Sequence, residues 1–322
     1  MSVLVYIESE QGKFKKASFE VASYAKEVAD KSGTSVTAVT FNAQDTSELG
    51  KYGVDKVLAI SNDTLSKFNA EPYADALKQA AEKEGSKIIV LSQSSNSKYL
   101  APILSVQMEA GYASNVVALP ESTDPFTVKR TAFTNKAFTF TKINTDVKII
   151  GLSKNAFGVK ETQADAQEEA FSPSLSDQDF TVNVESVDKA TDKVTIADAE
   201  IVVSGGRGLK GPENWGMIEE MAEILGAATA CSKPVSDMGW RPHSEHVGQT
   251  GKPVASNLYI AVGISGAIQH LAGINAAKTK VVINNDAEAP FFKAADYGIV
   301  GDAFEIVPRL NEKLKEFKAK NA

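Results

Sequence analysis

The feature that most constrains the fold is a regular alternation of short apolar runs with amphipathic segments of helical length. Before residue 195, strand-like runs fall at Val3–Ile7, Ser35–Phe41, Lys56–Ile60 and Lys87–Leu91, and helical periodicity fits Lys16–Lys31, Tyr73–Glu84 and Ser97–Met108. Strands joined by crossover helices form a mostly parallel sheet with helices on both faces. The pattern therefore predicts an α/β fold.

Two later stretches of this half differ in character. Thr127–Thr141 alternates β-branched and aromatic residues with polar ones, which predicts antiparallel strands along one edge of the sheet. Gln163–Lys193 is rich in Gln, Asp, Glu and Ser and contains Pro173, so we expect an extended connector there. We place the boundary after it, which gives domains of residues 1–195 and 196–322.

The second half repeats the same pattern. We expect strands at Glu200–Val203, Ala227–Cys231, Leu258–Val262, Lys280–Ile283 and Gly298–Val300, helices at Asn214–Leu225, Gly266–Ile274 and Phe304–Ala319, and a long loop up to about Ser256. This predicts a second doubly wound, Rossmann-like domain. Ligands of such open sheets bind beyond the carboxyl ends of the strands, where the unusual residues of this half lie.

Composition excludes several classes of protein. The chain has 322 residues, of which 43% are hydrophobic and 23% charged, as in ordinary soluble domains. No apolar run approaches the ~20 residues of a membrane span, and the first residues read as a strand rather than a signal, so we expect a cytoplasmic protein without membrane insertion. The single Cys231 excludes an internal disulfide. A net charge of −7 argues against nucleic-acid binding.

A glycine-rich turn follows the first strand of the second half. Gly206, Gly208 and Gly211 have GxGxxG spacing, which would let backbone amides approach a phosphate, and Pro212 suits a helix start. Arg207 could add forked donors to a phosphate or to a flavin edge. The spacing alone is weak, and an exposed arginine in an ordinary tight turn is the alternative.

The loop from Cys231 to Lys252 is long for a compact domain, which favours a functional role. It contains a cation just past a strand end, Lys233, and a small polar turn at Gly248–Gly251 that could hold a ring system or a pyrophosphate. His243 and His246 could in principle be ligands of a zinc ion. They lie three residues apart in a loop with no second ligand pair, so we expect no metal site.

Two further regions that follow predicted strands carry polar side chains. The strand at 258–262 turns through Gly263 and Ser265 into a helix that bears Gln269 and His270. Ala267 stands where a nucleophile elbow requires glycine, so this is not an esterase serine. Asn284 and Asp302 also follow strands, where they could contact an adenosine or cap a helix. Four such turns on one sheet favour one extended ligand of FAD length.

Four segments together resemble the electron transfer flavoprotein alpha subunit. They are Ser204–Gly208, Val247–Lys252, Leu258–His270 and Ala295–Val300, and the similarity covers the second domain closely and the first more loosely. The resemblance implies an FAD-carrying electron carrier with no catalytic residue and no substrate of its own. Electrons would come from dehydrogenases such as acyl-CoA dehydrogenases and pass to a quinone oxidoreductase.

The family's cofactor contacts can be carried over by position. Arg207 should lie over the flavin, and Ser232 with the turn Val247, Gly248, Gln249 and Thr250 should contact the isoalloxazine. The segment Ser265, Gly266, Ala267, Ile268, Gln269 and His270 should wrap the pyrophosphate and the N1 and O2 side of the flavin, where donors stabilise negative charge. Asn284 and Asp302 should hold the adenosine. Lys233 stands where many members have arginine, which predicts an altered flavin potential.

The resemblance also implies a partner. A smaller beta subunit, which in the family carries AMP or a second FAD, would share the flavin site and pack against the first domain. Two alternatives remain open from the residues. One is a nicotinamide- or flavin-dependent oxidoreductase with its own substrate, for which His270 and Asp302 are the ionisable candidates. The other is a nucleotide-sensing module built on the first half, which lacks a glycine-rich phosphate loop.

Overall fold

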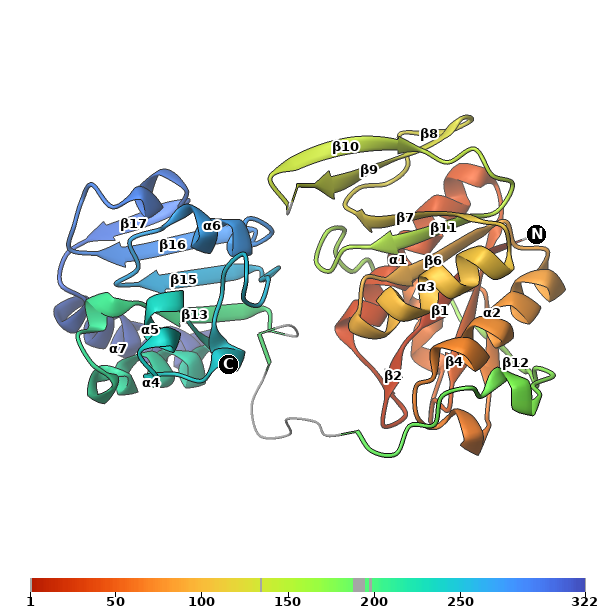
Figure 1. Cartoon of the computed structure of the whole chain (residues 1–322), viewed down its shortest axis with the longest axis horizontal. Coiled ribbons are helices and arrows are strands. Elements are labelled where there is room, and N and C mark those ends of the chain that lie inside the picture. The colour runs from red at the N-terminus through yellow and green to blue at the C-terminus, as the bar shows by residue number, and fades with distance from the viewer. Residues whose placement is uncertain (1, 134, 188–194, 197–198, 322) are drawn as a thin grey trace. The chain divides into compact units, whose positions relative to one another are not determined.

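The structure is a computed structural model of the chain, and it describes residues 2–133, 135–187, 195–196 and 199–321. These form two compact units (Figure 1), the first built from residues 2–132 and 137–187 and the second from residues 133, 135–136, 195–196 and 199–321. Part of the predicted connector, residues 188–193, lies outside the described residues, and the domain boundary at residue 195 stays a prediction. No described helix has the length and apolar character needed to cross a bilayer.

The first unit contains one ten-stranded sheet, with the order β10-β9-β7-β11-β6-β1-β4-β5-β12 and with β8 paired to β9. Its strands are β1 (Ser2–Ile7), β4 (Ser35–Phe41), β5 (Lys56–Ile60), β6 (Ile88–Ser92), β7 (Gly111–Val116), β8 (Ser122–Thr123), β9 (Phe126–Ala132), β10 (Ala137–Lys142), β11 (Lys148–Leu152) and β12 (Gln167–Ala170). The six strands from β7 to β5 in this order pair in parallel, and β9 pairs antiparallel with β10, as predicted for that edge.

Helices α1 (Lys16–Ser32), α2 (Ala70–Glu84) and α3 (Ser95–Gln107) cover this sheet. Alternate residues of β1 divide between two cores: Val5 packs in the cluster that includes α1, and Leu4 packs in the cluster that includes α2 and α3. This alternation follows from the period of two along a strand. The predicted doubly wound arrangement of the first unit is therefore confirmed.

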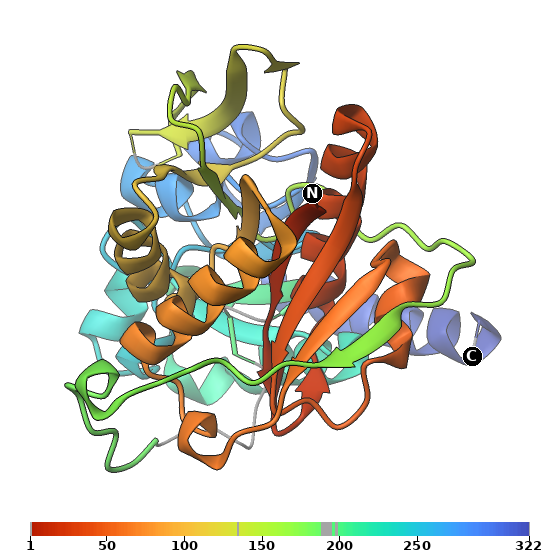
Figure 2. The ribbon, with the colours of Figure 1, turned by 90° about the vertical axis from the view of Figure 1, so that its right-hand side faces the viewer.

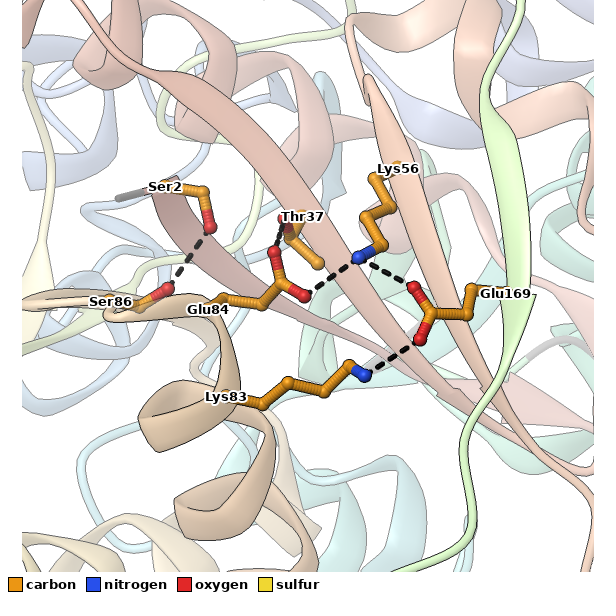
Figure 3. Close-up of polar contacts among 7 residues, drawn as sticks. All are labelled: Ser2, Thr37, Lys56, Lys83, Glu84, Ser86 and Glu169. Carbon is orange, nitrogen blue, oxygen red and sulfur yellow. Dashed lines mark hydrogen bonds and ion pairs between the residues drawn. The ribbon is translucent and has the colours of Figure 1, made fainter.

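The predicted connector contributes a strand that the sequence pattern did not indicate. β12 pairs in parallel with β5 at the sheet edge, where Figure 2 shows it in green beside the orange strand. Its residues Gln167–Ala170 lack an apolar face, and ion pairs hold it instead (Figure 3). The Glu169 carboxylate lies 2.7 Å from the ammonium groups of both Lys56 and Lys83, and Lys56 also pairs with Glu84 at 2.8 Å.

The second unit contains a five-stranded, all-parallel sheet with the order β14-β13-β15-β16-β17. Its strands are β13 (Ile201–Gly205), β14 (Ala228–Cys231), β15 (Leu258–Val262), β16 (Thr279–Asn284) and β17 (Tyr297–Val300). The chain moves from β13 outward to β14 and then returns to the other side at β15. The topological switch point, where the crevice of such a sheet lies, is therefore between the carboxyl ends of β13 and β15.

Helices α4 (Gly216–Leu225) and α7 (Ala303–Asn321) pack on one core of this unit, and α6 (Ile268–Ile274) packs on the other. The loop predicted to run from Cys231 to about Ser256 contains a short helix, α5 (Lys233–Asp237). Ser232 occupies its N-cap position and Pro234 lies in its first turn, where a proline costs no backbone hydrogen bond. Five helical residues are too few for a periodic pattern, so the sequence did not indicate this helix.

Candidate functional site

At the switch point, the turns that follow β13 and β15 are in direct backbone contact. A Cβ atom at Gly206 would lie 2.1 Å from the Gly263 carbonyl oxygen, and one at Gly208 would lie 2.7 Å from the Gly263 Cα. The Gly206 amide donates to the Val262 carbonyl at 2.9 Å, and the Gly208 amide donates to the Gly263 carbonyl at 3.1 Å. These two amides are therefore occupied. The expectation that they approach a phosphate is wrong, and the glycines instead permit close packing of the two turns.

Arg207 lies between these two glycines, and its side chain is exposed to solvent. It begins the short helical turn Arg207–Leu209. Within the described part of the chain, its guanidinium makes no hydrogen bond or ion pair. Its five N–H donors are thus available to an anion or to a ring edge at the switch point.

His270 lies inside the second unit and is 6% exposed. Its Nε2 is 2.9 Å from the hydroxyl of the fully buried Tyr259. Its Nδ1 is also buried and makes no hydrogen bond within ordinary geometric limits to the described residues, although the main chain of Val247 lies near enough to act on it. Burial lowers the pKa of His270 to about 4, against a smaller raising effect of Val247, so the imidazole is neutral at pH 7.

The predicted turn Val247–Thr250 and the predicted segment 265–270 lie against each other. The Gln249 amide donates to the Gln269 carbonyl at 2.7 Å, and a Cβ atom at Gly273 would lie 2.6 Å from the Gly248 Cα. The side chains of Gln249, Thr250 and Gln269 are all exposed. Backbone contacts thus fix the turn against α6 and leave its polar side chains free to meet a ligand.

The turn from Ser265 to Ala267 is held by a residue that the sequence pattern did not single out, Phe291. The Phe291 amide donates to the Ser265 carbonyl at 3.0 Å, and a Cβ atom at Gly266 would lie 2.6 Å from the Phe291 nitrogen. Gly266 has a φ of 87°, which favours glycine. Phe291 is fully buried and stacks with Tyr259 at 6.5 Å between ring centroids. The side chains of Ser265, Ala267 and Ile268 remain exposed.

Ser232 and Lys233 lie at the start of α5, beyond the end of β14. Ser232 is 7% exposed, and its amide donates to the Gly205 carbonyl at 3.1 Å, which ties α5 to the switch point. The exposed Lys233 ammonium pairs with the Asp237 carboxylate of its own helix at 2.7 Å. Exposed pairs of this spacing contribute only about 0.3–0.5 kcal/mol, so Lys233 could exchange Asp237 for a bound anion at little cost.

Asn284 and Asp302 both make local hydrogen bonds. The Asn284 side chain is 8% exposed, donates to the Ile264 carbonyl at 3.1 Å and accepts from the Asp286 amide at 3.0 Å. It thus joins the end of β16 to the turn after β15. The exposed Asp302 carboxylate accepts from the Phe304 amide at 2.9 Å at the start of α7, which is the helix-capping role that the sequence left open.

Two other buried side chains in this region, Cys231 and His246, have shifted pKa values. Burial raises the pKa of the Cys231 thiol to about 12, so at neutral pH it is an uncharged core group. Burial also lowers the pKa of His246, which is 2% exposed beside the turn at Gly248. Among the described residues, no group of three or more His, Cys, Asp or Glu side chains is placed to hold a metal ion.

Comparison with known proteins identifies two matching regions. The electron transfer flavoprotein domain matches residues 3–177, and the electron transfer flavoprotein FAD-binding domain matches residues 195–275. The electron transfer flavoprotein subunit alpha of Thermoanaerobacterium thermosaccharolyticum is 33% identical over 326 residues, which cover 98% of each chain. That of Bacillus subtilis is 35% identical and covers 98% of this chain and 97% of its own. The mitochondrial subunit alpha of Oryza sativa subsp. indica is 35% identical and covers 82% of this chain and 75% of its own.

Proposed function

This chain belongs to the electron transfer flavoprotein family as an alpha subunit, and from that premise we propose that it holds FAD at the switch point between β13 and β15. It is an electron carrier rather than an enzyme that converts a substrate of its own. The relatives do not favour the alternative of a nicotinamide- or flavin-dependent enzyme with its own substrate.

The observation that carries the placement of FAD is the exposed guanidinium of Arg207 at the switch point, which makes no hydrogen bond or ion pair to the described residues. Two further features support it. The turns at Gly248 and Gly266 are closely packed, because a Cβ atom at Gly266 would lie 2.6 Å from the Phe291 nitrogen and one at Gly273 would lie 2.6 Å from the Gly248 Cα, and exposed polar side chains surround both turns. The buried Nδ1 of His270 makes no hydrogen bond within ordinary geometric limits to the described residues, which is a state that a ligand group could relieve. These residues fit a flavin dinucleotide.

The roles proposed for the residues follow from their positions. Arg207 would lie over the flavin, and Ser232, Lys233 and the turn at 247–250 would surround the isoalloxazine. The turn at 265–269 would offer exposed Ser265 and Gln269 to the pyrophosphate. Asn284 and Asp302 would lie near the adenosine, each with a side chain already oriented by backbone hydrogen bonds.

Bound FAD supplies reversible electron transfer, and the protein's part is to bind it and to set the charge around it. Arg207 and Lys233 carry positive charge at neutral pH and would favour the reduced cofactor. His270 would contribute as a neutral hydrogen-bonding group, because its low pKa leaves it uncharged at pH 7. Tyr259 fixes the imidazole from the opposite side through Nε2.

The alpha-subunit family implies a beta-subunit partner. We propose that the first unit packs on that partner and that the partner carries AMP or a second FAD. Acyl-CoA dehydrogenases or related flavoenzymes would donate electrons, as in fatty acid oxidation, and a quinone oxidoreductase would accept them. We propose a cytoplasmic location for the complex.

The test is the visible spectrum of the chain, co-expressed and purified with its beta subunit, during stepwise anaerobic reduction with dithionite. We expect flavin absorption that is lost in two one-electron steps, and no reduction by NADH alone. A colourless complex would contradict FAD binding. Direct two-electron reduction by NADH would contradict the carrier function and would favour the alternative of an enzyme with its own substrate.

A further inference from the structure

A cavity of about 280 Å³ lies in the first unit at the carboxyl ends of β1 and β4. Its walls come from β1 and the turn after it, the end of β4, the short helix Asp63–Leu65 and the first turns of α2. The volume is near the lower end of the range of about 300–1,000 Å³ for small-molecule pockets. None of the residues that line it carries a formal charge. The cavity therefore suits a small, uncharged ligand.

The floor of the cavity is a cluster of three aromatic rings. Phe41 and Tyr73 stack with their centroids 3.9 Å apart, and Tyr6 meets Phe41 edge-on at 5.7 Å. The Tyr73 hydroxyl donates to the Leu65 carbonyl at 2.7 Å, which fixes that ring. All three rings are 4–6% exposed. The cluster therefore forms a rigid wall of the cavity, of which only a small part of each ring is accessible to a ligand.

The rim of the cavity has a fixed backbone and free polar side chains. The Gln44 amide donates to the Gly12 carbonyl at 2.9 Å, so the turn after β1 is joined to the end of β4. The exposed side chains of Gln11, Gln44 and Ser66 make no hydrogen bond to the described residues. Carboxamides offer a donor and an acceptor on one group, which matches the edge of a nitrogen heterocycle.

A negative charge stands beside this cavity, at the switch point between β1 and β6. The Glu8 carboxylate, next to the lining residue Ile7, accepts hydrogen bonds from the hydroxyls of Ser92, Ser94 and Ser97 at 2.7, 2.5 and 3.1 Å. It thus occupies the start of α3, where the phosphate of a ligand could otherwise lie. Burial raises the pKa of the lining residue Tyr6, and the negative charge of Glu8 adds to that rise.

We propose that this cavity binds an uncharged planar nitrogen heterocycle, such as a nicotinamide or a nucleobase, and that Glu8 excludes anionic ligands of the same shape. The ring contacts the small accessible parts of Tyr6, Phe41 and Tyr73 that border the cavity. Its polar edge meets the side chains of Gln11, Gln44 and Ser66. All residues that line the cavity belong to the first unit.

Saturation-transfer NMR tests this on the flavin-loaded complex, with nicotinamide and nicotinate as probes that differ in one neutral or charged group. We expect nicotinamide to bind and nicotinate to bind at least about tenfold more weakly. Ser66→Phe, which fills the mouth, should abolish the nicotinamide signal. Ser47→Phe places the same ring on an exposed surface residue outside the cavity and should leave the signal unchanged. Glu8→Gln should raise nicotinate binding toward that of nicotinamide.

Three results would overturn the proposal. One is no saturation transfer to nicotinamide at millimolar concentration. Another is a nicotinamide signal that survives Ser66→Phe, which would locate binding elsewhere in the complex. The third is equal binding of the two probes to the parent complex, or a nicotinate signal that Glu8→Gln does not change. Either result would show that the charge of Glu8 does not exclude anionic ligands.

Discussion

The Tyr259 hydroxyl lies 2.9 Å from Nε2 of His270, and both side chains are buried in the second unit. Tyr259→Phe removes this partner and leaves Nε2 of His270 buried without one. We expect a loss of about 1–3 kcal/mol of unfolding free energy, the usual cost of such a group. Both tryptophans, Trp215 and Trp240, lie in the second unit, so urea unfolding followed by tryptophan fluorescence measures this unit.

The matched control for that prediction is Tyr297→Phe, which removes the same hydroxyl from a residue that is 67% exposed. It should change the unfolding free energy little. A Tyr259→Phe protein as stable as the parent would show that the hydrogen bond to His270 contributes nothing.

The pKa of His270 predicts a pH-dependent stability of the second unit. Burial lowers this pKa to about 4 from the ordinary value of about 6.5, so between these values the unfolded chain binds more protons than the folded one. The stability is fully present above pH ~6.5 and falls toward pH ~4, by up to about 3 kcal/mol. The check is the pH dependence of the tryptophan-monitored unfolding free energy. His270→Asn should flatten its slope, whereas Asn at the exposed His243 should not. Equal slopes in all three proteins would contradict this account.

A second acid-sensitive contact holds β12. Hydrogen bonds and ion pairs from Lys56 and Lys83 lower the pKa of Glu169 to about 2. The contact is therefore present above the ordinary carboxyl pKa and is lost as pH falls from about 4 toward about 2. Glu169→Gln should increase hydrogen exchange in residues 163–175 at neutral pH, and its difference from the parent should vanish near pH 2. Glu121→Gln at another surface position should show no difference. Unchanged exchange in Glu169→Gln at neutral pH would exclude this role.

The parallel strands β7 and β11 were not predicted from the sequence. The other parallel strands, apart from β12, were predictable as short apolar runs, and their predicted bounds differ from those observed by at most two residues. Strand β12 was not predictable, because ion pairs rather than buried apolar residues hold it at the sheet edge. The convergence of four turns at one sheet edge also follows from the strand pattern. The inward orientation of His270 does not, because Tyr259 reads in the sequence as one more core residue of a buried strand.

Lys233 stands where many members of the family have arginine, and it is exposed and paired only with Asp237 among the described residues. We expect Lys233→Arg to raise the flavin midpoint potential, because a planar fork of donors favours the reduced form more than a point charge does. A tenfold preference corresponds to about 59 mV for one electron. Spectroelectrochemical titration of the complex measures it, with Lys278→Arg, at an exposed residue before β16, as a control outside the proposed site. Identical potentials in the Lys233→Arg protein and the parent would contradict a place for this residue near the ring.

The most direct test of the central claim is the affinity of the apo-complex for FAD, measured by quenching of flavin fluorescence, in Arg207→Gln and in the matched surface variant Arg309→Gln. A hydrogen bond to a charged group contributes about 1.5–3 kcal/mol, so we expect Arg207→Gln to weaken FAD binding by about 10- to 100-fold and Arg309→Gln to leave it unchanged. Equal affinity of the Arg207→Gln complex and the parent would contradict the placement of FAD at the switch point between β13 and β15.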